Sequence, residues 1–246
     1  MMWRPAVSRG ELRENEVHVW RAALDVSAKE FERLARSLSE EEQARARRYI
    51  VEYARVHFAA ARGILRDILS RYLGLPPAEI RFTYGKSGKP ALAGEINTAA
   101  LRFNLSHSHG FALYAVTCGR ETGIDIEKVR PEPSASQIAE RFFSPCEAAA
   151  LRELPPELVP AGFFLCWTRK EAYIKACGEG LYMNLKNFDV SLTPGEPAKL
   201  LAVRDDASEA SRWSLMDLKP HPHYTAALAV EGAIPKLCLF DWRNLT

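Results

Sequence analysis

The sequence contains no apolar run long enough to cross a membrane as a helix, which takes about 20 consecutive apolar residues. Met1–Pro5 is followed by polar residues and not by an apolar stretch, so a secretory signal is not expected. The net charge is only +2, which leaves no global basic field of the kind that nucleic-acid-binding proteins use. These shortages predict a cytoplasmic protein with neither a membrane nor a nucleic acid as its partner.

Cysteine is scarce and scattered. The five cysteines include no Cys-x-x-Cys pair, and an odd number without metal-binding spacing predicts free thiols in a reducing compartment. Hydrophobic residues, in contrast, make up 47% of the chain, which is enough for a real core. At 246 residues that core could serve one large domain or two small ones.

Residues 167–176 are predicted to lie inside a helix, since they are mostly good helix formers and no glycine or proline lies between Trp167 and Gly178. Glu171 falls on a partly apolar stripe of that helix, with Lys170 and Lys175 flanking it. A carboxylate between two ammonium groups can hold a cation and an anion together, as a metal-bound phosphate requires. An amphipathic helix with a Glu171–Lys175 pair, worth about 0.2–0.5 kcal/mol, is the simpler interpretation, and this segment alone favours it.

Isoleucine and carboxylate alternate in residues 123–127, which predicts a strand. Side chains two residues apart on a strand share a face, so Asp125 and Glu127 point one way while the isoleucines point into a core. Two carboxylates about 7 Å apart repel each other unless water or a cation lies between them. Hard oxygen ligands suit Mg²⁺, which also takes substrate phosphate. A sheet with one solvated acidic face is a common alternative.

Residues 103–108 alternate in the same way and predict a strand that ends in a polar turn. Ser106, His107 and Ser108 supply hydroxyl and imidazole donors, which an anion site requires. A serine hydrolase is the competing interpretation. However, neighbours on an extended chain face opposite ways, so Ser106 and His107 cannot easily form a nucleophile–base pair. The chain also has no Gly-x-Ser-x-Gly elbow.

In order and spacing, these three motifs resemble those of 4′-phosphopantetheinyl transferases of the larger, surfactin-synthetase-activating (Sfp-like) type. Residues 85–90 (GKSGKP) and 141–147 (RFFSPCE) match further stretches of that family. The resemblance implies an α+β fold in which a single chain forms two similar halves related by a pseudo-twofold axis, with the active site in the cleft between them. We therefore expect an N-terminal half on the nucleotide side of coenzyme A, residues 1–119, and a C-terminal half with the metal site, residues 120–246.

The resemblance also implies the chemistry. The enzyme would move the 4′-phosphopantetheine arm of coenzyme A to a serine hydroxyl of an apo acyl or peptidyl carrier protein and release 3′,5′-ADP. Mg²⁺ or Mn²⁺ would be held by Asp125, Glu127 and Glu171. Glu171 would act as the base or position it, and Lys170 or Lys175 would take the leaving charge.

Further coenzyme contacts follow from the same resemblance. The residues expected to contact the 3′-phosphate are Lys89, Ser106 and His107. Those expected to hold the pyrophosphate are Lys170 and Lys175. Two arginines of a basic helical region, Arg55 and Arg62, are expected to face the nucleotide, since planar, multi-donor arginine suits phosphate. A monomer is implied. The carrier could serve fatty acid, polyketide, nonribosomal peptide or lysine metabolism, and the sequence leaves that choice open.

The remaining patterns predict the other elements. Helices are expected from Ser27, from Ser39 to Gly74 with a kink near Tyr49, over 136–143, and over about 161–177. The strands expected in the first half of the chain are 17–20, 80–84, 101–106 and 111–118. Five strands between 188 and 242 are expected to form a meander.

Three other classes of protein share some of these features. A coenzyme A sensor or degenerate homologue would have little need for all three carboxylates and both lysines. A metal-dependent phosphohydrolase would use the same carboxylates but would need no carrier. A nucleic-acid-binding protein is suggested only by the arginine-rich helix, against a near-neutral total charge.

Overall fold

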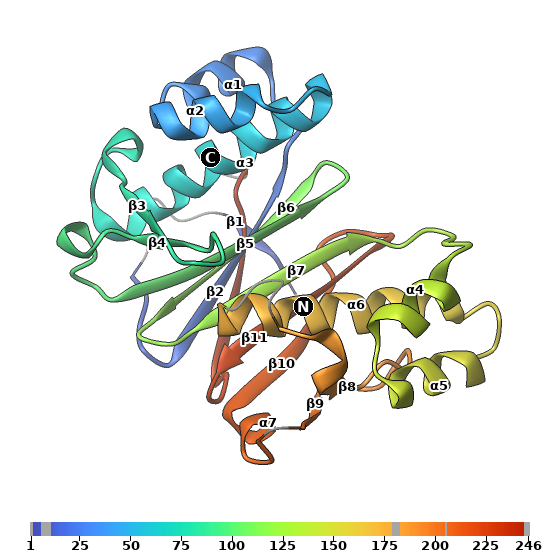
Figure 1. Cartoon of the computed structure of the whole chain (residues 1–246). Helices are drawn as coiled ribbons and strands as arrows, with labels where there is room; N and C mark the ends of the chain where they lie inside the picture. The colour runs from blue at the N-terminus through green and yellow to red at the C-terminus, as the bar shows by residue number, and fades with distance from the viewer. Residues whose placement is uncertain (1, 6–10, 179–182, 205, 244–246) are drawn as a thin grey trace.

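The computed structural model describes residues 2–5, 11–178, 183–204 and 206–243, and two β-sheets form its centre (Figure 1). The first sheet has the strand order β1-β12-β2-β6-β5 and the second the order β10-β11-β7. Strands of the first sheet are β1 (Arg4–Pro5), β2 (Glu16–Ala23), β5 (Leu101–Ser108), β6 (Phe111–Cys118) and β12 (Lys236–Asp241). Strands of the second are β7 (Thr122–Lys128), β10 (Trp213–Leu218) and β11 (Tyr224–Glu231).

Helices lie beside both sheets (Figure 1). Those beside the first sheet are α1 (Ala28–Ala35), α2 (Glu40–Arg47) and α3 (Glu52–Leu73). Those beside the second are α4 (Ala135–Phe142), α5 (Pro145–Glu153) and α6 (Val159–Cys177). The smaller elements are the hairpins β3 (Phe82–Tyr84) with β4 (Pro90–Leu92) and β8 (Phe188–Val190) with β9 (Leu200–Val203), the short helix α7 (Glu209–Arg212), and 3₁₀ turns at Pro77–Glu79, Gly94–Ile96 and Leu185–Asn187.

The two halves repeat one plan. In each, a strand is followed by three helices, a small hairpin and two more strands: β2, α1–α3, β3–β4, β5, β6, then β7, α4–α6, β8–β9, β10, β11. The three main strands also pair alike, because β6 lies between β2 and β5 just as β11 lies between β7 and β10, all antiparallel. The expected α+β fold of two similar halves is thus confirmed.

Each half contains a buried ion pair at an equivalent position. Glu42 and Glu147 each close a capping box at the start of a short helix, and each then binds a cation of the next long helix. Glu42 accepts from Arg62 and Arg66 of α3, both at 2.7 Å, and Glu147 accepts from Lys170 of α6 at 2.7 Å. The expected helix from Ser39 is interrupted at residues 48–51, between α2 and α3.

The expected C-terminal meander is wrong. Strand β12 pairs in parallel with β2 and β1, in the first sheet, and β8–β9 form a separate hairpin. A strand within residues 120–246 therefore belongs to the sheet of the first half. Alternation along the chain predicts a strand but does not select its neighbour, which here is a strand more than 200 residues away.

An apolar layer between the sheets holds the halves together. Val17 and Val19 of β2 pack there with Ile124 and Ile126 of β7, all fully or almost fully buried. The isoleucines of the acidic strand thus face a core, as expected from their alternation. β5 is an edge strand of the first sheet and β7 is an edge strand of the second, and these two strands lie in contact. Within the described ranges, no helix combines the length and apolarity needed to span a membrane.

Candidate active site

Three alternate residues of β5 reach across to β7. Asn104 Oδ1 accepts the backbone N–H of Ile124 at 2.9 Å, and Ser106 Oγ donates to Asp125 Oδ1 at 2.7 Å. Ser108 Oγ donates to Glu127 Oε2 at 2.8 Å. Because alternate side chains of a strand share a face, the two polar motifs of the sequence form one continuous seam between the halves.

Gly123 allows helix α6 to lie directly on β7. A Cβ atom at Gly123 would lie 2.1 Å from the carbonyl oxygen of Ala172 and 2.3 Å from the backbone nitrogen of Ala176. Only glycine permits so close an approach of helix and strand backbones. The approach brings Glu171 and Lys175 of α6 beside the acidic side chains of β7.

Lys175 and Asp125 form the shortest ion pair of this seam. Lys175 Nζ lies 2.5 Å from Asp125 Oδ1 and 3.1 Å from Ser106 Oγ. Asp125 is buried, and its second oxygen, Oδ2, has no hydrogen-bond partner among the described residues. A buried carboxylate oxygen without a partner is costly, so Asp125 has the capacity to bind a further cation.

The pKa values of the other two carboxylates, Glu127 and Glu171, are both raised. Burial raises the pKa of Glu171 most, Lys175 opposes that rise, and the charges of Asp125 and Glu127 add to it. Burial also raises the pKa of Glu127, which Ser108 partly offsets by its hydrogen bond, while the charge of Asp125 raises it further. The charge of Asp125 acts on both Glu127 and Glu171, so the three carboxylates lie near enough to one another to interact.

The donor chemistry fits a divalent metal such as Mg²⁺, since carboxylate oxygens are its preferred protein ligands. The orphaned Oδ2 of Asp125 is an acceptor that such an ion would satisfy. As the side chains stand, however, the described residues contain no group of three His, Cys, Asp or Glu side chains arranged to hold an ion. In this arrangement the ammonium of Lys175 supplies the positive charge next to Asp125.

A cavity of about 320 Å³ opens beside this pair, lined by Ser106, His107 and Lys175 at the seam and by Arg45 and Tyr49 from the end of α2. His107 reaches solvent, yet the walls around it desolvate the imidazole and lower its pKa, and the charges of Lys175 and His57 add to this. The cavity thus has hydroxyl, imidazole, ammonium and guanidinium donors on its walls, which is the chemistry an extended polyphosphate needs.

Lys170 lies elsewhere. Its side chain is fully buried, and Nζ donates to Glu147 Oε1 and to the carbonyl oxygen of Phe188, both at 2.7 Å. Neighbouring residues on a helix point about 100° apart, so Lys170 faces α5 and β8 while Glu171 faces β7. This position gives no support to the expected contact between Lys170 and pyrophosphate.

Lys89 is also committed to other partners. Its ammonium donates to Glu121 Oε2, to the carbonyl oxygen of Thr122 and to that of Ala176, at 3.1, 3.3 and 3.1 Å. Three acceptors use all three donors of an ammonium group. Lys89 therefore fastens the β3–β4 hairpin to the end of α6, while Gly88 next to it lines the cavity.

The two expected arginines differ. Arg62 lines the cavity, but its guanidinium is buried and bonded to Glu42 and to the Tyr84 hydroxyl. Arg55 is exposed, lies 3.5 Å from Glu52, and is not among the residues that line the cavity.

Sequence reasoning overlooked several cavity residues, namely Arg45, Tyr49, Phe58 and Tyr84. The only signal was that a basic and aromatic stretch coincides with the expected kink near Tyr49. The role of Ser108 as the partner of Glu127 could have been inferred from the equal spacing of the two strands' polar residues.

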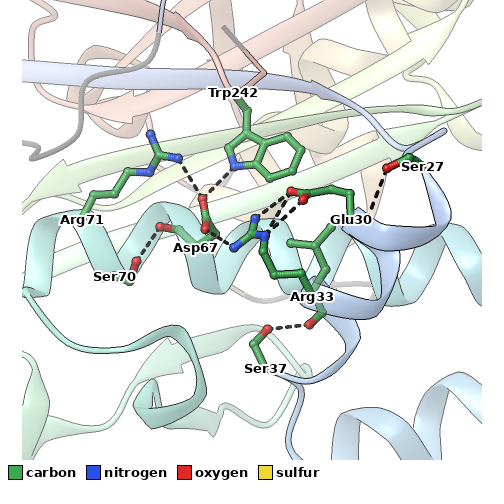
Figure 2. A network of polar contacts seen from close by, with 9 residues as sticks. Ser27, Glu30, Arg33, Ser37, Asp67, Ser70, Arg71 and Trp242 are labelled. Carbon is green, nitrogen blue, oxygen red and sulfur yellow. Dashed lines mark hydrogen bonds and ion pairs between the residues drawn. The ribbon is translucent and has the colours of Figure 1, made fainter. Parts of the chain in front are cut away.

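The first half has a counterpart of Glu171 whose carboxylate is already bonded to donors of the protein. Asp67 lies seven residues before Gly74 and Glu171 lies seven before Gly178, and both glycines end their helices in the left-handed conformation. Figure 2 shows Asp67 enclosed by donors.

Those donors are Trp242 and Arg71 at 2.8 Å and Arg33 at 2.9 Å. Burial would raise the pKa of Asp67, but these hydrogen bonds outweigh it and lower the pKa. One half thus neutralises its helix carboxylate internally, and the other leaves it available.

Comparison with known proteins agrees with this geometry. Residues 22–119 match the model of the 4′-phosphopantetheinyl transferase N-terminal family, and residues 121–229 match that of the 4′-phosphopantetheinyl transferase superfamily. The chain is 44% identical to the 4′-phosphopantetheinyl transferase HetI of Nostoc sp. over 94% of each chain. It is 33% identical to a putative 4′-phosphopantetheinyl transferase of Synechocystis sp. (85% of this chain, 89% of the relative). It is 31% identical to the transferase Sfp of Bacillus subtilis (68% and 72%). The chain belongs to the 4′-phosphopantetheinyl transferase family.

Proposed function

We propose that this enzyme transfers the 4′-phosphopantetheine arm of coenzyme A to a serine hydroxyl of an apo acyl or peptidyl carrier protein, with Mg²⁺ as the required ion. Membership of the family supports the transfer. The seam supports the rest, because Asp125 contacts Ser106 and Lys175, which line a cavity whose walls carry donors for phosphate. Glu127 and Glu171 lie near enough to Asp125 to interact with it.

Asp125, Glu127 and Glu171 would hold the metal, with Mn²⁺ as an alternative ion. When bound, the ion would neutralise the diphosphate and stabilise the charge that develops on it. The unpaired Oδ2 of Asp125 is the single observation that carries this part of the proposal. Ser106 and Ser108 orient the carboxylates of Asp125 and Glu127 through their hydroxyl groups.

The reaction itself exchanges one phosphorus–oxygen bond for another. The serine oxygen attacks the phosphorus next to the pantetheine, and the bond from that phosphorus to the bridging oxygen breaks, so 3′,5′-ADP leaves with the electron pair. Glu171, whose raised pKa makes it a stronger base than an ordinary glutamate, takes the serine proton or positions the group that does. Lys175 is placed to stabilise the leaving charge, since its ammonium lines the cavity.

His107 is the proposed contact for the 3′-phosphate, because its imidazole lines the cavity beside Lys175. Replacing it with alanine should raise the KM for coenzyme A more than the KM for dephospho-coenzyme A, which has no 3′-phosphate. Equal effects on the two substrates would remove this role.

Mass spectrometry tests the proposal as a whole. With Mg²⁺, coenzyme A and a panel of apo carrier proteins, at least one carrier should gain the mass of one phosphopantetheine group. Asp125→Ala should fold, as judged by circular dichroism, and slow the transfer by about 10²–10³ or more, which is typical when an electrostatic stabiliser is lost. Release of 3′,5′-ADP without a carrier would instead identify a hydrolase.

We also infer a cytoplasmic, monomeric enzyme. Cys118, Cys146, Cys166 and Cys238 are free thiols, which suits a reducing compartment. Both halves of the cleft come from one chain, so a second copy is not needed to complete it.

A further inference from the structure

An unusual group of exposed apolar side chains lies where α2 meets α3. Ile50 is 98% exposed and Val51 is 62% exposed, and Tyr49 and Tyr53 beside them are also exposed. We call these four residues the junction patch. Single exposed apolar residues are normal, but four within five positions form a contiguous surface of the kind that marks a binding site.

The fold does not explain this patch. Val51 occupies the N-cap position of α3 and makes no side-chain cap hydrogen bond, whereas Ser27 and Ser39 cap α1 and α2 in the usual way. Valine at an N-cap is among the least favourable choices. The sequence therefore gives up helix stability to place an apolar side chain on the surface, and such local conflicts are typical of functional sites.

The two tyrosines are already fixed in place. Tyr49 packs against the ring of Phe58 at a centroid distance of 5.3 Å, and Tyr53 lies on the ring of His57 at 3.8 Å. Because both rings are already held in place, the binding of a partner costs little side-chain entropy at these tyrosines, which favours binding.

The charge around the patch is positive. Exposed arginines surround it on both helices, namely Arg45, Arg47, Arg48 and Arg55. Glu52 offsets part of this charge through its pair with Arg55. The uncapped first turn of α3 adds the positive end of a helix dipole. The complementary partner has an acidic surface with at least one apolar side chain that packs on Ile50 and Val51.

The patch is continuous with the candidate active site. Tyr49 and Arg45 line the same cavity as His107 and Lys175. A macromolecule that delivers a hydroxyl group to this cavity from the side of α2 would cover the patch at the same time.

From these observations we propose that the junction patch docks the acidic carrier protein whose serine receives the phosphopantetheine. This inference rests on the function proposed above. It predicts that affinity for the carrier depends on Ile50 and Val51, and that the coenzyme binds independently of both.

The test compares Ile50→Ser/Val51→Ser with the unsubstituted enzyme, using an apo acyl carrier protein of fatty acid synthesis as the probe. Removal of two packed aliphatic side chains should raise the KM for the carrier about tenfold or more. The kcat and the KM for coenzyme A should not change. Leu201→Ser is the matched control, because Leu201 is 56% exposed on β9 of the other half, and it should have no effect.

A second variant tests the sign of the charge. Arg47→Glu should raise the KM for the carrier at low salt and flatten its salt dependence, since like charges then face each other.

Three outcomes would overturn the proposal. In the first, the double variant has the same KM for the carrier as the unsubstituted enzyme. In the second, the KM for coenzyme A rises in the double variant, which would assign the patch to the coenzyme. Alternatively, sedimentation could show a dimer of the unsubstituted chain that the double variant dissociates, so that a second copy occupies the patch. Failure of the proposed function would look different, because the unsubstituted enzyme would then modify no carrier in the panel, and the docking proposal would fall with it.

Discussion

Replacing Lys175 with methionine should have opposite effects on metal binding and on transfer. The ammonium of Lys175 lies 2.5 Å from Asp125 Oδ1, where it neutralises the carboxylate that the metal needs. Two unit charges about 5 Å apart interact by about 3 kcal/mol at an effective dielectric constant near 20. Removing this competing charge should strengthen binding of a divalent ion in the absence of coenzyme by about 10- to 100-fold. Transfer should nevertheless slow by about 10²–10³, because the variant has no cation for the leaving phosphate.

The affinity can be measured by titrating Mn²⁺ into the coenzyme-free protein and following its electron paramagnetic resonance signal. Lys199→Met is a suitable control, since Lys199 is exposed and far along the chain from the seam. The variant Lys175→Met should also unfold more easily without metal, because a buried carboxylate loses its partner. Mn²⁺ binding that is unchanged or weaker in Lys175→Met would refute the idea that this lysine competes with the ion.

Three further predictions concern the support of the site. Gly123→Ala should destabilise the protein by at least about 1–3 kcal/mol, the usual cost of overpacking, because its Cβ would lie 2.1 Å from the Ala172 carbonyl oxygen; a melting temperature equal to that of the unsubstituted protein would contradict the close approach of α6 to β7. Lys170→Met should lower the free energy of unfolding by about 3–5 kcal/mol, since it leaves Glu147 buried and unpaired, and urea denaturation would measure this; an unaltered midpoint would show that the pair is not structural. The raised pKa of Glu171 means that folding favours its protonated form, so its contribution to stability is complete at low pH and is lost as the pH rises through the folded-state pKa. Mg²⁺ should therefore raise the melting temperature more at pH 8 than at pH 5, and a larger increment at pH 5 would contradict this sign.

Local signals predicted the elements of the fold well. The helix expected from Ser39 begins there as α2, and the helix expected over about 161–177 ends at Gly178 in the left-handed conformation. Alternation located β5 and β7 to within one or two residues at either end. These features depend on residues within a few positions of one another, so the sequence contains all the information that they require.

Partners distant in the chain were harder to predict. Strand β12 joins β2 because Leu239 completes the layer between the sheets while Phe240 stacks on Trp20, and neither contact leaves a trace in the local pattern. Lys170 and Glu171 are neighbours in sequence, yet a helix turns them toward different elements.

The candidate site shows the same division. Periodicity places Asp125 and Glu127 on one face, and the structure adds the serines of β5 that bind them. The resemblance to a family, and not the periodicity, predicts Glu171 as the third metal ligand beside Asp125 and Glu127, and this remains a proposal. The short contact between Lys175 and Asp125 was not expected, because the sequence cannot show which of several acceptors an ammonium group will choose.

The most direct test is an electron–nuclear double resonance spectrum of Mn²⁺ bound to the enzyme with coenzyme A. If Asp125, Glu127 and Glu171 hold one ion against the diphosphate, the spectrum should show coupling between manganese and phosphorus. Asp125→Asn should lose both this coupling and most of the bound Mn²⁺. Tight Mn²⁺ binding without phosphorus coupling, or coupling that persists in Asp125→Asn, would contradict a metal site at the seam of the two halves.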